Sequence, residues 1–258
     1  MKTDKDACEE QNVAGLYQDT QVAESYCQRR FAHSWSSLLH RKQVTEVNRA
    51  LAQFQPGDTV ELAPGPARLT TEIRGVQRGI MVEYSHEMLT VAQKRLSEAG
   101  LASRWDLRHG NAFDLQSMDI HCDFLFTFRF IRHFIMSDRI RLYKQIHHCL
   151  RPGGYFIMDV VNRIMRERIE AQSSKKSKNE LPVYDMAYTP CEFEDEIEEH
   201  GFVVRRLIPV IKHFGLQSWV SFTLDHRIAS LAYVTVAILE RVPSLEPLEW
   251  IAVCQKME

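Results

Sequence analysis

Short apolar runs alternate along the chain with longer stretches in which apolar side chains recur every three or four residues. Short runs bounded by Gly, Pro, Asp or Asn are typical of buried strands, whereas spacings of three and four are typical of amphipathic helices. Strands and helices that alternate at short intervals call for a parallel sheet with right-handed crossovers, so the pattern predicts an α/β fold. The expected strands cover residues 58–62, 79–84, 105–109, 122–128, 155–161, 202–211 and 250–254.

The helical stretches carry start and stop signals. A side-chain oxygen just before a periodic stretch predicts an N-cap, and a glycine just after it predicts the end of the helix. These signals are Ser85 and Gly100 around residues 87–99, Ser137 before a helix that runs to Leu150, and Thr189-Pro190 with Gly201 around the helix between them; shorter helices are expected over residues 68–75 and 163–170.

Two further stretches leave alternatives open. Residues 22–54 have helical periodicity together with aromatic and basic side chains, which predicts either a helix packed on the sheet with its cations in water or a flap over the opening of a site. Residues 218–241 are apolar at helical spacing, although the Tyr-Val-Thr-Val run at 233–236 also suits a strand.

The chain is expected to form one domain. Residues 1–21 are predicted to be a mobile leader, and residues 22–258 a single domain without internal repeats. Its helical N-terminal flap would span residues 22–54, and two inserts, at 163–189 and 214–247, would lie on the substrate side.

Composition narrows the function classes. A hydrophobic fraction of 45% and a charged fraction of 26% are typical of a soluble globular protein, and the net charge of −2 argues against a nucleic-acid binder with a broad basic face, although a local basic groove is compatible with it. Six cysteines without CxxC spacing indicate reduced thiols in a cytoplasmic protein. The polar N-terminus argues against a signal peptide, and no apolar run is expected to span a membrane. The oligomeric state is left open.

Polar and small residues gather where the first four expected strands end. Glu61 precedes a Pro-Gly-Pro turn at 64–66, Glu83 ends the second strand, a Gly-Asn-Ala stretch follows the third at 110–112, and an aromatic and basic cluster follows the fourth at 128–134. In an open parallel sheet the ligand binds at the carboxyl ends of the strands. We therefore expect these four features to converge on one crevice.

This ordered series resembles the class I S-adenosylmethionine-dependent methyltransferases, in particular their small-molecule branch. The resemblance implies a Rossmann-like fold with a mostly parallel seven-stranded sheet, helices on both faces, and S-adenosylmethionine as the cofactor. It covers about residues 22–211 and is carried by Glu61-Leu-Ala-Pro-Gly-Pro-Ala67, Val82-Glu83-Tyr-Ser-His-Glu-Met-Leu89, His109-Gly-Asn-Ala-Phe-Asp-Leu115 and Leu150-Arg-Pro-Gly-Gly154.

The resemblance implies a role for each residue of these motifs. Glu83 would accept both ribose hydroxyls through its carboxylate. Tyr84 and Met88 would pack on the adenine faces, or belong to the core instead. Asn111 and the Ala112 N–H would meet the adenine edge, although Asn111 can equally be a turn former. The other implied cofactor-binding positions are Ala63, Gly65 and Ala67, which let the backbone approach the methionine part, Glu61 near its amino group, and Phe128.

The sequence departs from the family pattern in two places. Ala63 and Ala67 replace two of the three glycines of the first loop, which is tolerable where the local φ is negative. Asn111 stands where the family usually has Asp, so the contact there loses its charge. Both changes bear on cofactor affinity more than on cofactor identity.

The cluster at 128–134 lies where the family meets its acceptor. His133 is the candidate general base, with an intrinsic pKa that suits the role, or else a histidine that packs or caps the helix start. Arg129 or Arg132 would hold an anionic group of the acceptor, or be solvated. The Thr-Phe-Arg-Phe sequence at 127–130 lacks the Asn/Asp-Pro-Pro-aromatic motif of nucleic-acid amino-methylating relatives. The adjacent pair His147-His148 has no nearby third ligand, so no metal site is expected.

The sequence thus predicts methyl transfer from S-adenosylmethionine to an oxygen or nitrogen of a small-molecule acceptor. One alternative is a non-catalytic relative that binds cofactor poorly and acts through a partner docked on residues 218–241. An oxidoreductase of the NAD type would require a fuller G-x-G-x-x-G loop than residues 63–68 provide.

Overall fold

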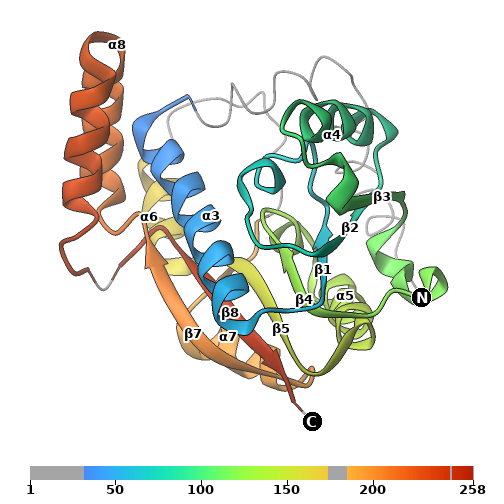
Figure 1. Cartoon of the computed structure of the whole chain (residues 1–258). Helices are drawn as coiled ribbons and strands as arrows, with labels where there is room; N and C mark the ends of the chain where they lie inside the picture. Colours follow the sequence, from blue (N-terminus) through green and yellow to red (C-terminus); the bar gives the residue numbers. More distant parts are fainter. Residues whose placement is uncertain (1–31, 174–184, 245, 258) are drawn as a thin grey trace.

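The computed structural model describes residues 32–173, 185–244 and 246–257. The predicted leader at 1–21, the first ten residues of the predicted flap and most of the loop after residue 173 lie outside the described residues. The described chain forms a central sheet with helices on both faces (Figure 1).

The sheet has the predicted architecture. Its strand order is β3-β2-β1-β4-β5-β8-β7, and a two-residue strand, β6, pairs with β5 off this path. Strands β1 to β6 pair in parallel, whereas β8 runs antiparallel to β5 and β7. The mostly parallel seven-stranded sheet is therefore confirmed, with β6 as an addition. The strands are β1 Asp58–Leu62, β2 Arg78–Glu83, β3 Trp105–His109, β4 Cys122–Thr127, β5 Leu150–Asn162, β6 Ala187–Tyr188, β7 Phe202–Val210 and β8 Glu249–Lys256.

The end signals of most helices are confirmed. The Ser85 hydroxyl accepts from the Met88 N–H at 3.1 Å, and Thr189 forms a capping box with Glu192. Gly100 takes the left-handed backbone that ends a helix. The helices are α3 Ser34–Phe54, α4 His86–Glu98, α5 Met136–Cys149, α6 Arg163–Ser173, α7 Pro190–Glu198 and α8 Phe214–Leu239, with short 3-10 turns η1 Thr70–Glu72, η2 Ala102–Arg104, η3 Ala112–Met118 and η4 Ile131–His133.

Three predicted boundaries were wrong. Ser137 does not cap α5, which begins one residue earlier without a side-chain cap. Residues 68–75 form only the short turn η1. Strand β5 begins at Leu150, before the Arg-Pro-Gly-Gly sequence that was predicted to be a turn. The extra residues of β5 are accommodated by an irregular register opposite Cys122 and Phe124 of β4.

Both faces of the sheet are buried. In β4, Phe124 and Phe126 join a cluster with α3, while Leu125 between them joins a cluster with α5 and α7. Alternating side chains of one strand point to opposite faces, so a strand buried on both sides is apolar throughout. Helix α3 contributes Val47 and Ala50 to the first cluster, which makes the described part of the predicted flap a packed core helix.

Helix α8 settles the ambiguity at 233–236 in favour of a helix, but the element is not straight. Ile228 has non-helical dihedral angles, and the Gln217 amide donates to the Val236 carbonyl at 3.2 Å. In a straight helix these two residues would lie ~28 Å apart along the axis. The element is therefore a helical hairpin that folds back at Ile228, and it packs beside α3 (Figure 1).

By length and composition alone, α8 could cross a membrane, with 11% of its apolar window buried. This contradicts the expectation that no apolar run reaches that length. The reversal at Ile228 leaves one half before it and one half after it, neither near the ~20 consecutive residues that a spanning helix requires.

Candidate cofactor and acceptor site

The loop after β1 has a left-handed backbone at every second residue. The φ angles are 50° at Ala63, 57° at Gly65 and 54° at Ala67. The condition of negative φ, under which the two alanines would be tolerable, is therefore not met. An L-residue in this region costs about 1–2 kcal/mol, because its Cβ crowds the following carbonyl. The loop thus keeps a conformation that suits three glycines, although two of the residues are alanines.

Surrounding contacts hold this loop in place. The Ala63 N–H donates to the Val82 carbonyl at 2.9 Å, and the Ala67 methyl group is fully buried in the core. The Gly65 N–H donates to the Glu83 carboxylate at 3.0 Å. Strain of this kind persists where the neighbouring structure over-determines the backbone, and it gathers at functional sites.

Glu83 joins the two strand ends. Its carboxylate accepts from Gly65 and, at 2.9 Å each, from the N–H groups of Tyr84 and Ser85. Burial raises its pKa, and this outweighs the three hydrogen bonds, which lower it. Two carboxylate oxygens offer about four acceptor sites, so roughly one is left. To accept two ribose hydroxyls, Glu83 would have to release one of its present donors.

The predicted adenine contacts differ in exposure. The Tyr84 side chain is 51% exposed and its ring centroid lies 6.0 Å from that of His109, so it is not a core residue. Met88 is buried under the loop, with its sulfur 4.0 Å from where a Cβ on Gly65 would lie. Asn111 is exposed and its Oδ1 accepts from the Phe113 N–H at 2.9 Å, the turn-forming role foreseen as its alternative. The adjacent Ala112 is buried.

Glu61 is a fully buried carboxylate close to the same loop. It accepts from the Thr70 hydroxyl at 2.5 Å. Burial raises its pKa to about 7; Thr70 and the charge of Arg68 lower the pKa but do not offset burial. A cationic group next to Glu61 would favour its ionised form.

Near the ends of β4 and β5, Arg132 is enclosed by carboxylates. It binds Asp185 through two hydrogen bonds of 2.8 and 2.9 Å, Asp159 at 2.9 Å and Glu249 at 3.3 Å. Burial alone would lower the pKa of Arg132, but these partners raise it well above its usual value. The guanidinium is occupied by the protein's own carboxylates, so the predicted contact of Arg132 with an anionic acceptor is wrong in this structure.

His133 lies next to this cluster, on η4. Its Nδ1 is 3.0 Å from Oδ1 of Asp185, and its side chain is largely buried. Burial would raise the pKa of Asp185, but Arg132 and His133 together hold it well below its usual value. An ionised carboxylate at Nδ1 fixes the orientation of an imidazole ring and favours the tautomer with its proton on that nitrogen.

Arg129, at the end of β4, keeps donor capacity. Its backbone is left-handed, with φ 59°, and its backbone N–H donates to the Asp159 carboxylate at 2.7 Å. Its Nε is buried without a hydrogen-bond partner. The neighbouring Phe128 is buried. An unpaired buried donor is costly unless a ligand or water satisfies it.

Comparisons with known proteins agree with this geometry. Residues 60–158 match the family model of a methyltransferase domain. The matched residues run from within β1 to within β5. Over 113 residues it is 28% identical to a protein of Mycolicibacterium smegmatis described as a probable S-adenosylmethionine-dependent methyltransferase, and the match covers 44% of this chain and 41% of that protein.

Solved structures of methyltransferases share the fold of this chain. An O-methyltransferase family protein from Burkholderia thailandensis superposes with a TM-score of 0.59 at 12% identity, covering 85% of this chain and 57% of that one. Magnesium protoporphyrin IX methyltransferase from Synechocystis, solved with bound S-adenosylhomocysteine, gives 0.59 at 10% identity, covering 86% and 85%. The chain spans less than two thirds of the length of the curated relative and of the Burkholderia protein.

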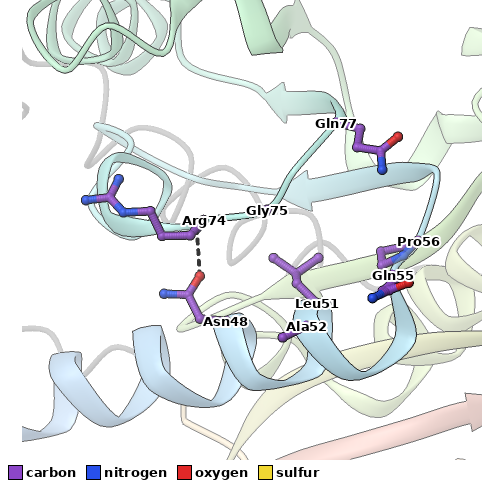
Figure 2. A pocket seen from close by; sticks show the side chains of 8 residues that line it. All are labelled: Asn48, Leu51, Ala52, Gln55, Pro56, Arg74, Gly75 and Gln77. Atoms are coloured by element: carbon purple, nitrogen blue, oxygen red, sulfur yellow. Dashed lines mark hydrogen bonds between the residues drawn. The ribbon is translucent and has the colours of Figure 1, made fainter.

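A hollow lies at the opposite end of the sheet, where β1 and β2 begin. Its volume is about 440 Å³, and the Arg74 N–H donates to the Asn48 side chain across its rim at 2.7 Å (Figure 2). Pro56 and Gln77 line it just before β1 and β2 begin, so it lies away from the strand ends where Glu61 and Glu83 meet.

Sequence reasoning missed most of the residues around Arg132 and His133. Asp159, Asp185 and Glu249 were not singled out. Asp159 carried a usable signal, because a charged residue inside an apolar strand needs a partner. Asp185 carried none, because it stands outside any periodic stretch. Within the described residues, no three His, Cys, Asp or Glu side chains lie close enough to hold a metal ion.

Proposed function

We propose that this chain is an enzyme that transfers the methyl group of S-adenosylmethionine to an oxygen or nitrogen of a small-molecule acceptor. The observation that carries the proposal is the loop of Ala63, Gly65 and Ala67, which keeps a glycine-like backbone and meets the Glu83 carboxylate. The similarity to S-adenosylmethionine-dependent methyltransferases and to an O-methyltransferase family protein supports it.

The residues at the ends of β1 and β2 would hold the cofactor. Glu83 would take the ribose hydroxyls once the Gly65 N–H is released, and Tyr84 would cover the adenine ring. Glu61 would stand beside the amino group, where a positive charge compensates its burial. Met88, Asn111, Ala112 and Phe128 complete the predicted set. The cofactor supplies an activated methyl group on a sulfonium, so the protein mainly has to align the acceptor and exclude water.

The residues near the ends of β4 and β5 would bind and deprotonate the acceptor. Asp185 orients His133, and the His133 Nε2 would remove the proton of an acceptor hydroxyl as the methyl group arrives. Arg129, with its unpaired buried Nε, would bind an anionic group of the acceptor. Arg132 has a different role from the one predicted, because it positions Asp185 and Asp159 instead of binding the acceptor.

One observation favours a second candidate, a methyltransferase-like protein that does not turn over. The Gly65–Glu83 hydrogen bond occupies the acceptor capacity that the ribose needs. Such a protein would bind cofactor weakly and act through a partner.

Ligand-dependent thermal stability separates these functions. S-adenosylhomocysteine, but not NAD, is expected to raise the unfolding temperature, since a ligand at a hundred times its Kd adds ~2.7 kcal/mol of stability. Glu83→Ala should abolish the shift, whereas Glu98→Ala, at an exposed position at the end of α4, should keep it. No shift with either ligand would favour the non-catalytic candidate. A full shift in Glu83→Ala would refute the assigned cofactor position.

A further inference from the structure

The α8 hairpin has an exposed apolar stripe on each of its two halves. On the first half, Trp219 is 62% and Phe222 is 59% exposed. On the second half, three apolar residues are 49–56% exposed. Spacings of three and four place the members of each stripe on one helix face. The side chains that make up the hairpin stripes, as we name them, are Leu216, Trp219 and Phe222 on the first half and Leu231, Val234 and Ile238 on the second.

The opposite face of the hairpin is attached to the domain. The Ser221 hydroxyl accepts from the Trp35 N–H at 3.1 Å, and the Asp225 carboxylate accepts from the Ser34 N–H at 3.0 Å. Tyr233 lies under the Arg41 guanidinium at 5.0 Å. Because α3 already covers this face, the hairpin is held firmly against the domain. Of the stripe side chains, Phe222 also contacts His33, just before α3, with ring centroids 4.5 Å apart.

The exposed apolar area matches what a dimer requires. From their exposed fractions, the six stripe side chains present roughly 450 Å² of apolar surface. A standard interface buries about 800 Å² on each partner, of which about 500 Å² is apolar. The area also lies within the ~300–600 Å² of the largest, often functional, patch on a typical monomer.

The hairpin fits a protein partner better than a membrane surface. Residues 214–242 contain Asp225 and Glu240 against Arg227 and Arg241, so they have no basic excess that would attract anionic lipid. Neither half is long enough to span a bilayer. Two antiparallel helices with apolar stripes at three- and four-residue spacing can instead form half of a four-helix bundle.

We propose that the hairpin stripes of two copies of this chain pack against each other as an antiparallel four-helix bundle, which makes the protein a two-fold symmetric dimer. In such an isologous contact the same surface serves both partners, so no second complementary patch is needed. The Trp219 and Phe222 side chains would be the anchors, because large aromatic residues carry most of the binding energy in interfaces. The methyltransferase crevice does not take part.

Sedimentation velocity of the full chain over a wide range of protein concentration tests the proposal. The wild-type protein is expected to sediment as a dimer. The double variant Trp219→Lys with Ile238→Lys should weaken the dimer by about 100-fold or more and sediment as a monomer. Both positions are exposed, so its circular dichroism spectrum and unfolding of the dilute monomer should be unchanged. The matched control, Ile164→Lys with Met257→Lys, replaces two exposed apolar residues outside the hairpin and should remain a dimer.

Three results would overturn the proposal. A wild-type protein that stays monomeric at all concentrations has no such contact. A double variant that remains dimeric assembles through another surface. A wild-type monomer that co-sediments with phosphatidylcholine vesicles, while the double variant does not, uses the stripes to bind lipid.

Discussion

Two pairs of buried carboxylates at the strand ends are held in opposite ways. At the ends of β1 and β2, Glu61 and Glu83 are held by a hydroxyl and by backbone N–H groups, and burial raises the pKa of both. Near the ends of β4 and β5, Asp159 and Asp185 form ion pairs with Arg132. Glu249, at the start of β8, also contacts Arg132 but, like Glu61, has its pKa raised to about 7 by burial.

The difference shows which pair is prepared for a charged ligand. A buried carboxylate without a cationic partner is costly in its ionised form and gains from an incoming cation. A carboxylate that already pairs with an arginine gains little and serves instead to fix its neighbours. The first pair is therefore suited to the amino group of the cofactor, and the second pair is suited to holding His133 in one orientation.

Removal of the central arginine should have the largest effect. Arg132→Met leaves Asp159 and Asp185 buried without their cation, and it should destabilise the fold by about 3–5 kcal/mol in denaturant unfolding. Arg168→Met is the matched control, because Arg168 and its partner Glu246 are both exposed, at 54% and 38%, where such a pair contributes ~0–1 kcal/mol. Equal losses in the two variants would contradict the contrast between the two pairs of carboxylates.

The oriented histidine should matter next, and for turnover more than for stability. His133→Ala is expected to lower the rate of methyl transfer to a hydroxyl acceptor by about 100-fold, because the proton then leaves without a positioned base. His121→Ala is the control, since His121 also faces an aspartate, Asp119 at 3.4 Å, but on the surface. An unchanged rate in His133→Ala would show that His133 only packs. In that case Asp185 would serve Arg132 alone.

The contrast between the two pairs also marks what the sequence could predict. Strand β4 is apolar on both faces and α4 has the Ser85 cap, so local pattern was enough to place them and, with them, the strand ends. The enclosure of Arg132 depends on Asp185 and Glu249, which lie 53 and 117 residues away and carry no periodic or motif signal. Contacts that are made only by the fold cannot be derived from local spacing.

The same limit applied to backbone conformation. The sequence showed that Ala63 and Ala67 stand at glycine positions, but their sign of φ depends on the contacts of the loop with Val82 and the core. The fold-back of α8 at Ile228 was equally hidden, since the apolar pattern continues through it.

Cofactor affinity should depend on pH through Glu61. Its pKa of about 7 in the free protein means that at pH 6 most molecules carry a protonated Glu61, which must lose its proton before it can pair with the cofactor amino group. Binding of S-adenosylhomocysteine, measured by calorimetry, should therefore be about tenfold weaker at pH 6 than at pH 8.

Glu61→Gln is the control for this pH dependence. A neutral amide cannot titrate, so this variant should bind weakly and with the same affinity at both pH values. If the wild-type protein and Glu61→Gln change equally with pH, another group such as Glu249, whose pKa is also raised to about 7 by burial, is responsible. The pH dependence of cofactor binding would then arise from the carboxylates around Arg132 and not from Glu61.

The smallest effect concerns the strained loop beside the first pair. Ala63→Gly relieves the cost of a Cβ in left-handed backbone, about 1–2 kcal/mol, but stabilises the unfolded chain by roughly 0.4–1 kcal/mol of entropy. The variant should therefore be more stable than the wild-type protein by about 0.5–1 kcal/mol in denaturant unfolding. Ala67→Gly should be close to neutral, because it also removes a fully buried methyl group worth ~0.8 kcal/mol. Ala52→Gly, on the exposed side of α3, should instead destabilise by about 1 kcal/mol. If Ala63→Gly destabilises as much as Ala52→Gly, the loop does not hold the strained, glycine-like backbone on which the cofactor assignment rests.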